Sequence, residues 1–157
     1  MPATSLAQVL MDLTDLYSDR IIEIAANQPR PGRLAAPQAS ARKVARVCGS
    51  VIEVDVSVQA DVITGYGHEL SACALGQTSA AIVAREIVGT PIAEFRRVRD
   101  EMVRMLKENG PPPAGVRWAD LKWLEPVRAY RPRHASTLLV FDAVCEALDR
   151  IAADSAA

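Results

Sequence analysis

Hydrophobic and polar residues alternate over positions 52–58, whereas in most of the chain hydrophobic residues recur at helical spacing. In the alternating stretch, four β-branched residues occupy the even positions, and Glu53, Asp55 and Ser57 lie between them. This pattern is typical of a strand that buries one face, so we interpret Glu53 and Asp55 as its solvated face. With a turn at 59–61 and extended segments on both sides, it predicts a small three-stranded antiparallel sheet over residues 43–70.

Helical periodicity predicts most of the remaining elements. Pro29 and Pro31 end the first helix, because proline lacks a backbone N–H and disfavours helix in the residue before it. Trp118 and Trp123 are expected to be packing anchors. The predicted helices cover residues 4–27, 71–88, 91–109 and 135–152, with one short helical turn at 120–125 and a loop at 33–41. Together these elements predict an α+β fold in a single domain, with the sheet packed against four to five helices.

Composition narrows the functional classes. The 157 residues are 50% hydrophobic and only 4% aromatic, and the net charge of −1 gives no argument for a nucleic-acid or membrane partner. Three widely spaced cysteines do not form the pattern of a secreted disulfide framework. The sequence has neither a signal-peptide pattern nor an apolar stretch long enough to span a bilayer. We therefore expect a soluble, cytoplasmic protein.

Two of the cysteines lie at junctions between predicted elements. Cys48 starts the turn Cys48-Gly49-Ser50 between two strands, and Cys73 follows the last strand. If Ser71 caps the helix 71–88, Cys73 lies in its first turn, where the helix dipole favours the thiolate that binds metal or attacks sulfur. A buried cysteine that packs as a small hydrophobic residue is the alternative interpretation.

Histidine nitrogens could join these thiols at a metal site. His134 and Ser136 lie at the start of the last predicted helix, and His68 precedes Cys73 by five positions. Neutral imidazole binds both zinc and iron. The chain has no CxxC pair and no HExxH motif, so local spacing alone gives a metal site little support.

The order of these motifs is more specific than any one of them. Residues 17–23 and 27–32 (YSDRIIE and NQPRPG) resemble the YSxxVxxxxxNPRNxG opening of IscU/NifU-type iron–sulfur cluster scaffold proteins. Cys48-Gly49-Ser50 is similar to the CGD turn of that family, and SACALGQTSAA at 71–81 is similar to its GCxxxxASSS helix start. Asp142-Ala143 resembles its EDAI segment, and the longer stretch before the last helix resembles the SufU-like branch. The resemblance covers residues 16 to 148.

This resemblance implies a fold and a function. Those proteins pack a small antiparallel sheet against helices, and three cysteines, an aspartate and in some members a histidine gather at one exposed end. There they hold a labile [2Fe–2S] cluster or zinc. Sulfur arrives as persulfide from a cysteine desulfurase, and the cluster passes to carrier or apo-target proteins. The resemblance therefore implies Cys48 and Cys73 as ligands, in a scaffold protein rather than an enzyme.

The ligand positions depart from the family pattern. Ser50 occupies the aspartate position of the CGD turn, and Ser136 falls at the third cysteine when no gap is introduced. Since a hydroxyl is a much poorer iron ligand than a thiolate, His134 could replace the third cysteine, and His68 is a further candidate. Cys145 lies more than two helical turns after Ser136 and is interpreted as filler. The chain also lacks the LPPVK segment by which some members engage an Hsp70.

Three functional hypotheses follow. The first is a scaffold or accessory protein of iron–sulfur assembly that binds metal or cluster through Cys48, Cys73 and His134. The second is a metal-free docking or regulatory module of the same machinery, in which the arginines of the helix 91–109 form a contact surface rather than a solvated face. The third is cysteine-based sulfur transfer, with Cys73 as nucleophile and His68 or His134 as base.

Overall fold

A three-stranded antiparallel sheet with helices over one face forms the structure, a computed structural model that describes residues 16–156. The α+β fold predicted from the sequence is confirmed. The strands are β1 (Ala39–Ala45), β2 (Ser50–Gln59) and β3 (Val62–Ser71), in the order β1-β2-β3. The helices are α2 (Asp19–Ala26), α3 (Ala74–Glu86), α4 (Ile92–Lys107) and α5 (His134–Ala156), with the 3₁₀ helices η1 (Val116–Ala129) and η2 (Arg131–Arg133).

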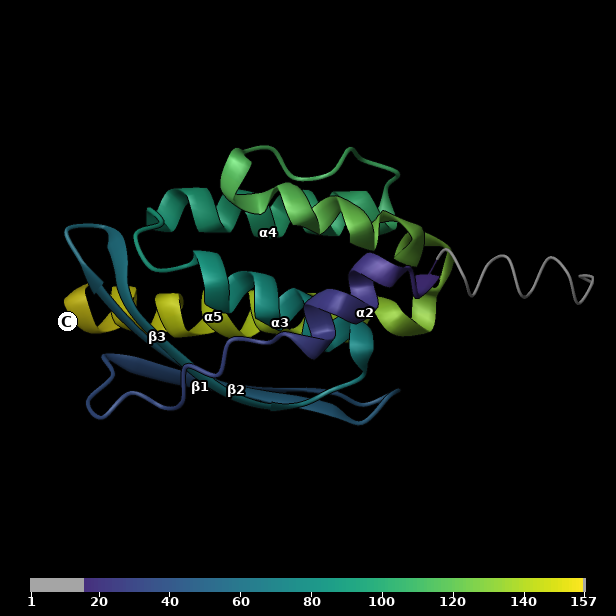
Figure 1. Cartoon of the computed structure of the whole chain (residues 1–157). Helices are drawn as coiled ribbons and strands as arrows, with labels where there is room; N and C mark the ends of the chain where they lie inside the picture. Colours follow the sequence, from purple (N-terminus) through teal and green to yellow (C-terminus); the bar gives the residue numbers. More distant parts are fainter. Residues whose placement is uncertain (1–15, 157) are drawn as a thin grey trace, which may run out of the picture.

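The helices lie in two layers over the sheet (Figure 1). α5 packs directly on β1 and β2 with α3 beside it, whereas α4 and η1 form the outer layer. The aromatic ring of Phe95 joins the layers, since it lies 5.9 Å from the ring of Trp118 and 5.8 Å from that of Phe141. Met102 and Met105 are fully buried, as their helical spacing predicts. Among residues 16–156 no helix is both long and apolar enough to cross a membrane.

The N-terminal helix is shorter than predicted in the part that the structure describes. Tyr17 and Ser18 are not helical. The Ser18 Oγ accepts a hydrogen bond from the N–H of Ile21 at 3.3 Å and so caps α2, which starts at Asp19. Residues 4–15 of the predicted helix lie outside the described residues.

Two other predicted segments differ from the structure. The loop expected over 33–41 ends where β1 starts at Ala39, and the single turn expected at 120–125 is part of the 14-residue helix η1. Trp118 is buried as expected, whereas Trp123 is 37% exposed and does not anchor the core. The side chain of Lys122 lies over the Trp123 ring instead.

Asp55 is buried, which overturns its interpretation as part of a solvated face. Its carboxylate accepts hydrogen bonds from the Arg33 Nε at 2.6 Å and Nη2 at 2.8 Å, from the Leu34 N–H at 3.0 Å and from the Ser40 hydroxyl at 2.5 Å. Arg33 also pairs with Glu53. The loop that carries Arg33 covers this side of the sheet. Alternation along a strand cannot predict that a segment distant in the sequence buries its polar face.

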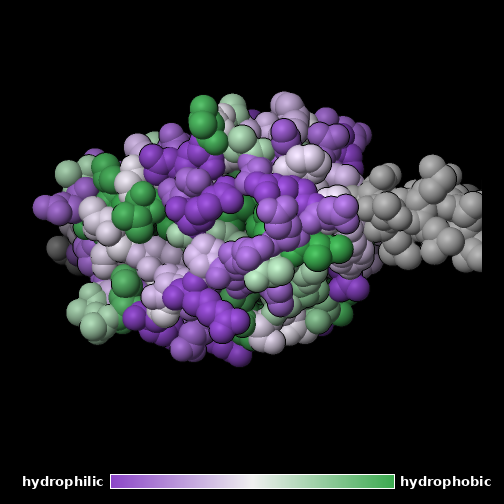
Figure 2. All heavy atoms as spheres, in the orientation of Figure 1, coloured by the Kyte–Doolittle hydropathy of each residue, from purple (hydrophilic) through white to green (hydrophobic). Residues whose placement is uncertain are grey.

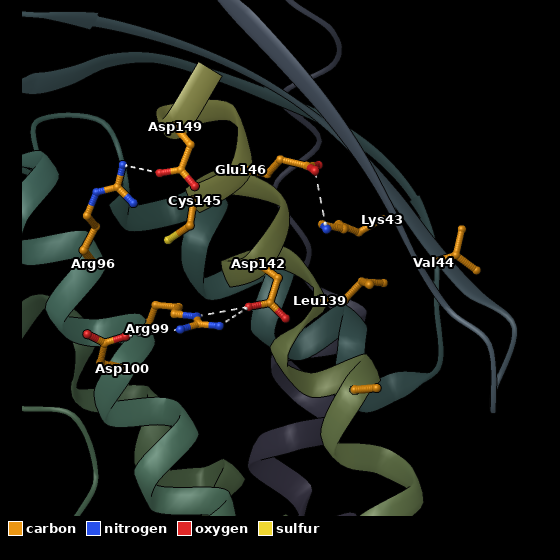
Figure 3. Close-up of a pocket in the computed structure, with 11 residues that line it drawn as sticks. Lys43, Val44, Arg96, Arg99, Asp100, Leu139, Asp142, Cys145, Glu146 and Asp149 are labelled. Carbon is orange, nitrogen blue, oxygen red and sulfur yellow. Dashed lines mark hydrogen bonds and ion pairs between the residues drawn. The ribbon is translucent and has the colours of Figure 1, made fainter. Parts of the chain in front are cut away.

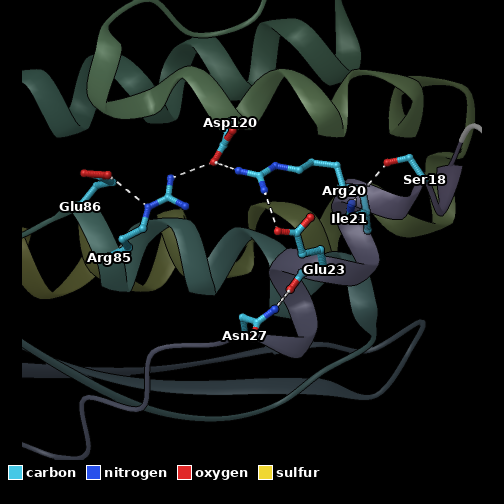
Figure 4. A network of polar contacts seen from close by, with 8 residues as sticks. All are labelled: Ser18, Arg20, Ile21, Glu23, Asn27, Arg85, Glu86 and Asp120. Carbon is cyan, nitrogen blue, oxygen red and sulfur yellow. Dashed lines mark hydrogen bonds and ion pairs between the residues drawn. The ribbon is translucent and has the colours of Figure 1, made fainter.

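A polar network joins α2, α3 and η1 on the outside of the molecule (Figure 4). Asp120 of η1 lies between two arginines, 3.0 Å from the Nη2 of Arg20 and 3.1 Å from the Nη2 of Arg85. Arg20 also pairs with Glu23 at 3.1 Å. These side chains are partly exposed, so the network links the three helices but adds little to the stability of the fold.

The surface seen in Figure 2 is largely hydrophilic, and its hydrophobic side chains form small separate patches. Exposed single hydrophobic residues are ordinary on soluble domains. The exposed large hydrophobic residues of the described chain are Ile22, Val44, Val47, Val88, Val116 and Trp123.

Candidate functional site

The thiols of Cys48 and Cys73 lie at the same end of the sheet. Cys48 belongs to the turn between β1 and β2, where the Gly49 N–H donates to the Ala45 carbonyl at 2.9 Å and Gly49 adopts a φ of 73° that favours glycine. Cys73 follows β3 and is the N-cap residue of α3. Because Val51 of β2 pairs with Ser71 of β3, the strand register brings the two thiol segments together.

Cys73 was predicted to lie in the first turn of α3. In the structure it lies one position before that turn, as the N-cap residue. Ser71 is still paired in β3 and does not cap the helix, and no side chain caps it. The backbone carbonyl of Cys73 accepts the first helical hydrogen bond, from the Gln77 N–H at 2.9 Å. The thiol therefore stands at the boundary between strand and helix.

Two serines link these cysteines into a cluster of four residues, Cys48, Ser50, Cys73 and Ser136, which we call the thiol site. The Ser50 Oγ lies 3.0 Å from the Cys48 Sγ and accepts a hydrogen bond from the Cys73 N–H at 3.4 Å. The Cys73 Sγ donates to the Ser136 Oγ at 3.5 Å. Both serines are buried and both thiols are half-buried. The structure thus brings together two predicted ligands and the two serines that occupy family ligand positions.

The surroundings of Cys48 favour its thiolate. Burial acts to raise the pKa of this thiol, but hydrogen bonding to Ser50 and Ser136 and the positive charge of Arg133 outweigh burial and hold the pKa below its ordinary value. Arg133 was not singled out from the sequence, although it lies three positions before Ser136 in an Arg-Pro-Arg run. Its backbone carbonyl also accepts the Ser136 hydroxyl hydrogen at 3.2 Å.

His134 starts α5 but turns its ring toward η1. Its Nε2 lies 3.0 Å from the Val127 carbonyl oxygen and 3.2 Å from that of Arg128. Since carbonyl oxygens only accept, this nitrogen carries the ring proton. Cys48, Cys73 and His134 do not form a group that could hold a metal ion, and the remainder of residues 16–156 contains no other such group of three or more His, Cys, Asp or Glu side chains.

His68 lies on β3, where burial lowers its pKa to about 4, and its ring is therefore neutral at pH 7. Its Nδ1 lies 2.7 Å from the hydroxyl of Tyr66. His68 has no hydrogen bond with a residue of the thiol site.

Cys145 lies apart from the thiol site, in a groove between α4, α5 and β1 (Figure 3). Burial raises the pKa of its thiol to about 11, which fits the interpretation of Cys145 as filler. Two arginines of α4 border this groove and pair with α5: Arg96 with Asp149 at 2.8 Å and Arg99 with Asp142 at 3.1 Å. These two arginines therefore join helices rather than form a wholly solvated face.

The donor set of the thiol site fits part of a soft-metal site. Zinc and the irons of clusters take thiolate ligands readily, and protein sites usually supply four ligands to a structural zinc ion or to a [2Fe–2S] cluster. The thiol site offers two thiols, while Ser50 and Ser136 serve as hydrogen-bonding groups beside them. Chemically, this arrangement can hold a metal or sulfur species that other ligands complete.

Among known proteins, only solved structures match this chain in the comparisons made. No protein-family model and no curated protein matches it. The crystal structure of the N-terminal part of a nitrogen-fixing NifU-like protein from Brucella abortus is 48% identical with a TM-score of 0.87, over 89% of this chain and 96% of that chain.

Two further solved structures share the fold at lower identity. One is a putative iron–sulfur cluster assembly scaffold protein for the SUF system from thermophilic Fervidobacterium islandicum AW-1, at 18% identity and a TM-score of 0.77 over 86% of this chain and 98% of that chain. The other is a hypothetical protein at 20% identity and a TM-score of 0.75, over 87% and 98%. Given 48% identity across nearly all of the Brucella domain, this chain belongs to the IscU/NifU-type family of iron–sulfur cluster assembly scaffold proteins.

Proposed function

We propose that this protein carries a labile [2Fe–2S] cluster or a zinc ion as cargo, with Cys48 and Cys73 as its thiolate ligands. One observation carries the proposal: the two thiols meet in a single hydrogen-bonded cluster at one end of the sheet. Thiolates bind iron and zinc, and half-exposed thiols leave cargo accessible to a recipient. The family membership supports the same function.

The serines determine how firmly the cargo is held. The Ser50 hydroxyl can donate a hydrogen bond to thiolate sulfur, and the Ser136 hydroxyl can do so once it turns away from the Arg133 carbonyl; such bonds tune a metal site without adding a ligand. The remaining ligands then come from outside the thiol site. For His134 to become the third ligand, it would have to bind through Nδ1, or its ring would have to leave the carbonyls of Val127 and Arg128.

Sulfur would reach the site from the persulfide of a cysteine desulfurase. A thiolate of the thiol site attacks the terminal sulfur of that persulfide, a new S–S bond forms, and the cysteine of the desulfurase leaves as thiolate. The exchange needs no external oxidant or reductant. Carrier or apo-target proteins would then receive the finished cluster.

Metal and acid-labile sulfide content of protein purified without air tests this proposal. We expect iron with sulfide, or zinc, in the wild type and in Cys145→Ser, and loss of either cargo in Cys48→Ser and Cys73→Ser. Cys145→Ser is the matched control because its thiol lies in the α4–α5 groove. Metal content that is unchanged in both thiol-site variants would refute the proposal.

A second candidate is a docking or regulatory module that has lost full ligation. It is favoured by the serines at two family ligand positions and by the lack of a three-ligand group in the described chain. In this case purified protein contains no stoichiometric metal, yet it forms a complex with a cysteine desulfurase that survives the double change Cys48→Ser/Cys73→Ser. Loss of the complex in that variant would rule against a purely docking role.

A further inference from the structure

A polar cavity of about 490 Å³ lies beside the thiol site, between the end of α2, the loop that follows it, β3 and α3. The residues that matter here are Gln28, Arg30, His68, Glu69 and Gln77, all of which line it. Gln77 connects the cavity with the thiol site: its side-chain Nε2 donates to the carbonyl of Ala72 at 2.8 Å, and its backbone N–H donates to the carbonyl of Cys73 at 2.9 Å. The cavity is not needed for the scaffold function proposed above.

The ring of His68 presents a hydrogen-bond donor to this cavity. His68 is only 5% exposed, and its Nδ1 contacts the hydroxyl of Tyr66, which is buried and has no other partner among residues 16–156. A buried O–H without an acceptor is costly, so Tyr66 donates to Nδ1 and the ring proton resides on Nε2. Nε2 has no partner in the described chain and is not a fully buried atom, and His68 lines the cavity, so we infer that Nε2 faces it.

Arg30 adds a positive charge to the same cavity. Its guanidinium is exposed and forms no ion pair with any described residue, unlike the neighbouring Arg33. The amide nitrogens of Gln28 and Gln77 are engaged with backbone carbonyls at 3.2 and 2.8 Å. Each glutamine amide keeps a second N–H, but the buried donor is the His68 Nε2–H and the positively charged donor is the Arg30 guanidinium.

The wall that carries these donors is held in place before any ligand binds. The backbone N–H of His68 donates to the Gly32 carbonyl at 3.1 Å, which ties the loop to the edge of β3. Two nitrogens of Arg33, the next residue, hold the buried Asp55. Arg30 therefore lies two residues before Gly32, whose backbone is held to β3. Glu69, the acidic residue of the cavity, is exposed. Because it follows His68 in the strand, its side chain points to the opposite face of the sheet from the His68 ring.

We propose that this cavity binds a small molecule that bears a carboxylate, with His68 Nε2–H donating to one carboxylate oxygen and Arg30 pairing with the group. Planar guanidinium and a fixed N–H donor suit a carboxylate better than a metal ion, because neither offers a lone pair. Burial keeps the His68 ring neutral, so the charge that selects an anion comes from Arg30.

Nitrogen-detected NMR of histidine-labelled wild-type protein, titrated with succinate, tests the proposal. Its uncharged analogue succinamide is the matched ligand control. In the free protein we expect a protonated Nε2 and an unprotonated Nδ1 for His68, and succinate should shift the Nε2 signal while succinamide does not. An Nδ1-protonated ring, or equal shifts with both compounds, would overturn the proposal.

Two arginine variants distinguish specific binding of succinate in the cavity from general attraction of an anion to a positively charged surface. Arg30→Gln should weaken succinate binding about tenfold or more, whereas Arg42→Gln should change it less than about twofold. Arg42 is a matched control because it is exposed, has no ion pair with a described residue and does not line the cavity. Equal losses in both variants would overturn the proposal.

A double variant tests the His68 Nε2–H donor without leaving the Tyr66 hydroxyl buried and unpaired. Tyr66→Phe/His68→Phe removes the N–H and the hydroxyl that depends on it, and thermal unfolding shows whether this variant is folded. A folded double variant that binds succinate as tightly as the wild type would overturn the assignment of His68. Binding of an acidic peptide but of no small carboxylate would overturn the choice of ligand.

Discussion

Arg33 holds Asp55 with two nitrogens, its Nε at 2.6 Å from Oδ2 and its Nη2 at 2.8 Å from Oδ1. The pair joins the loop after α2 to the middle strand of the sheet. Asp55 has no exposed surface, so a neutral residue in its place leaves a partly buried guanidinium without its main partner. Asp55→Asn should lower the free energy of unfolding by about 2–3 kcal/mol, measured by urea denaturation.

Glu53 provides the control for this change, since it is the second, more exposed carboxylate beside Arg33. Glu53→Gln should cost less than about 1 kcal/mol. Equal losses for Asp55→Asn and Glu53→Gln would contradict the assignment of Asp55 as the main anchor.

Acid should weaken the pair of Arg33 and Asp55, because it protonates the Asp55 carboxylate. Hydrogen bonds from Arg33 lower the pKa of Asp55 from its ordinary 3.8 to about 2 in the folded protein. A carboxyl with a depressed folded pKa contributes stability above its unfolded pKa and loses it as the pH falls. We expect about 2 kcal/mol to disappear between pH 5 and 2. The unfolding free energy of Asp55→Asn should fall less steeply over this range, and parallel curves would refute the linkage.

Gly67 should not tolerate a side chain. A Cβ at this position would overlap the carbonyl oxygen of Gly32 and crowd the backbone of Arg33 and Leu34, none of which can move without breaking the loop from the strand. Gly67→Ala should therefore cost about 2–3 kcal/mol in unfolding free energy. At Gly65 the nearest atoms belong to side chains at 3.3 Å and beyond, so Gly65→Ala should cost clearly less.

The two thiols with shifted pKa values should differ in reactivity. Cys48 has a lowered pKa and is half-buried, while the Cys145 pKa is about 11. At pH 7.5 iodoacetamide should label Cys48 at least about tenfold faster than Cys145, as read by mass spectrometry. Ser50→Ala removes a hydrogen bond to the Cys48 sulfur and should slow labelling of Cys48 while that of Cys145 stays unchanged. A faster Cys145 would contradict the assignment.

A third thiol should strengthen cargo binding. Ser136→Cys places a thiol where the hydroxyl oxygen now lies 3.5 Å from the Cys73 sulfur. Under anaerobic, reducing conditions we expect zinc to leave this variant at least about tenfold more slowly toward a chelator than it leaves the wild type. Thr137→Cys is the control, because the Thr137 hydroxyl is also buried and also donates to the Arg133 carbonyl, but it has no hydrogen bond with a cysteine. No gain in Ser136→Cys would argue against metal binding at the thiol site.

The middle strand and the three helices after the sheet were the most predictable part of the fold. Alternation at 52–58 located β2, and the helical periods located α3, α4 and α5 to within a few residues. The same alternation wrongly predicted that Asp55 is exposed, because a loop from more than 20 positions earlier in the chain buries it. Trp123 was misjudged because the short helical turn expected at 120–125 is part of a longer 3₁₀ helix, whose three residues per turn set the side-chain directions.

The site was predictable mainly through family motifs. Cys48 and Cys73 were located by the turn and the helix start, but neither motif reveals that Ser50 contacts both residues. The direction of the His134 ring depends on two carbonyls of η1, a helix whose length the sequence did not indicate. Arg133 lacked any periodic or motif signal beyond its neighbours in the chain.

The register shift between Ser57 and Val58 separates two ends of the sheet with different tolerance to change. The hairpin at Ala60 and Asp61 lies on one side of the shift, and the cysteines lie on the other. A short peptide tag inserted at that hairpin would lie beyond the irregular pairing from Val51 and Ser71, although it would meet the hydrogen bond from Ile92 to Asp61. We therefore expect a change in chain length at this end of the sheet to leave the spacing of the two thiols constant.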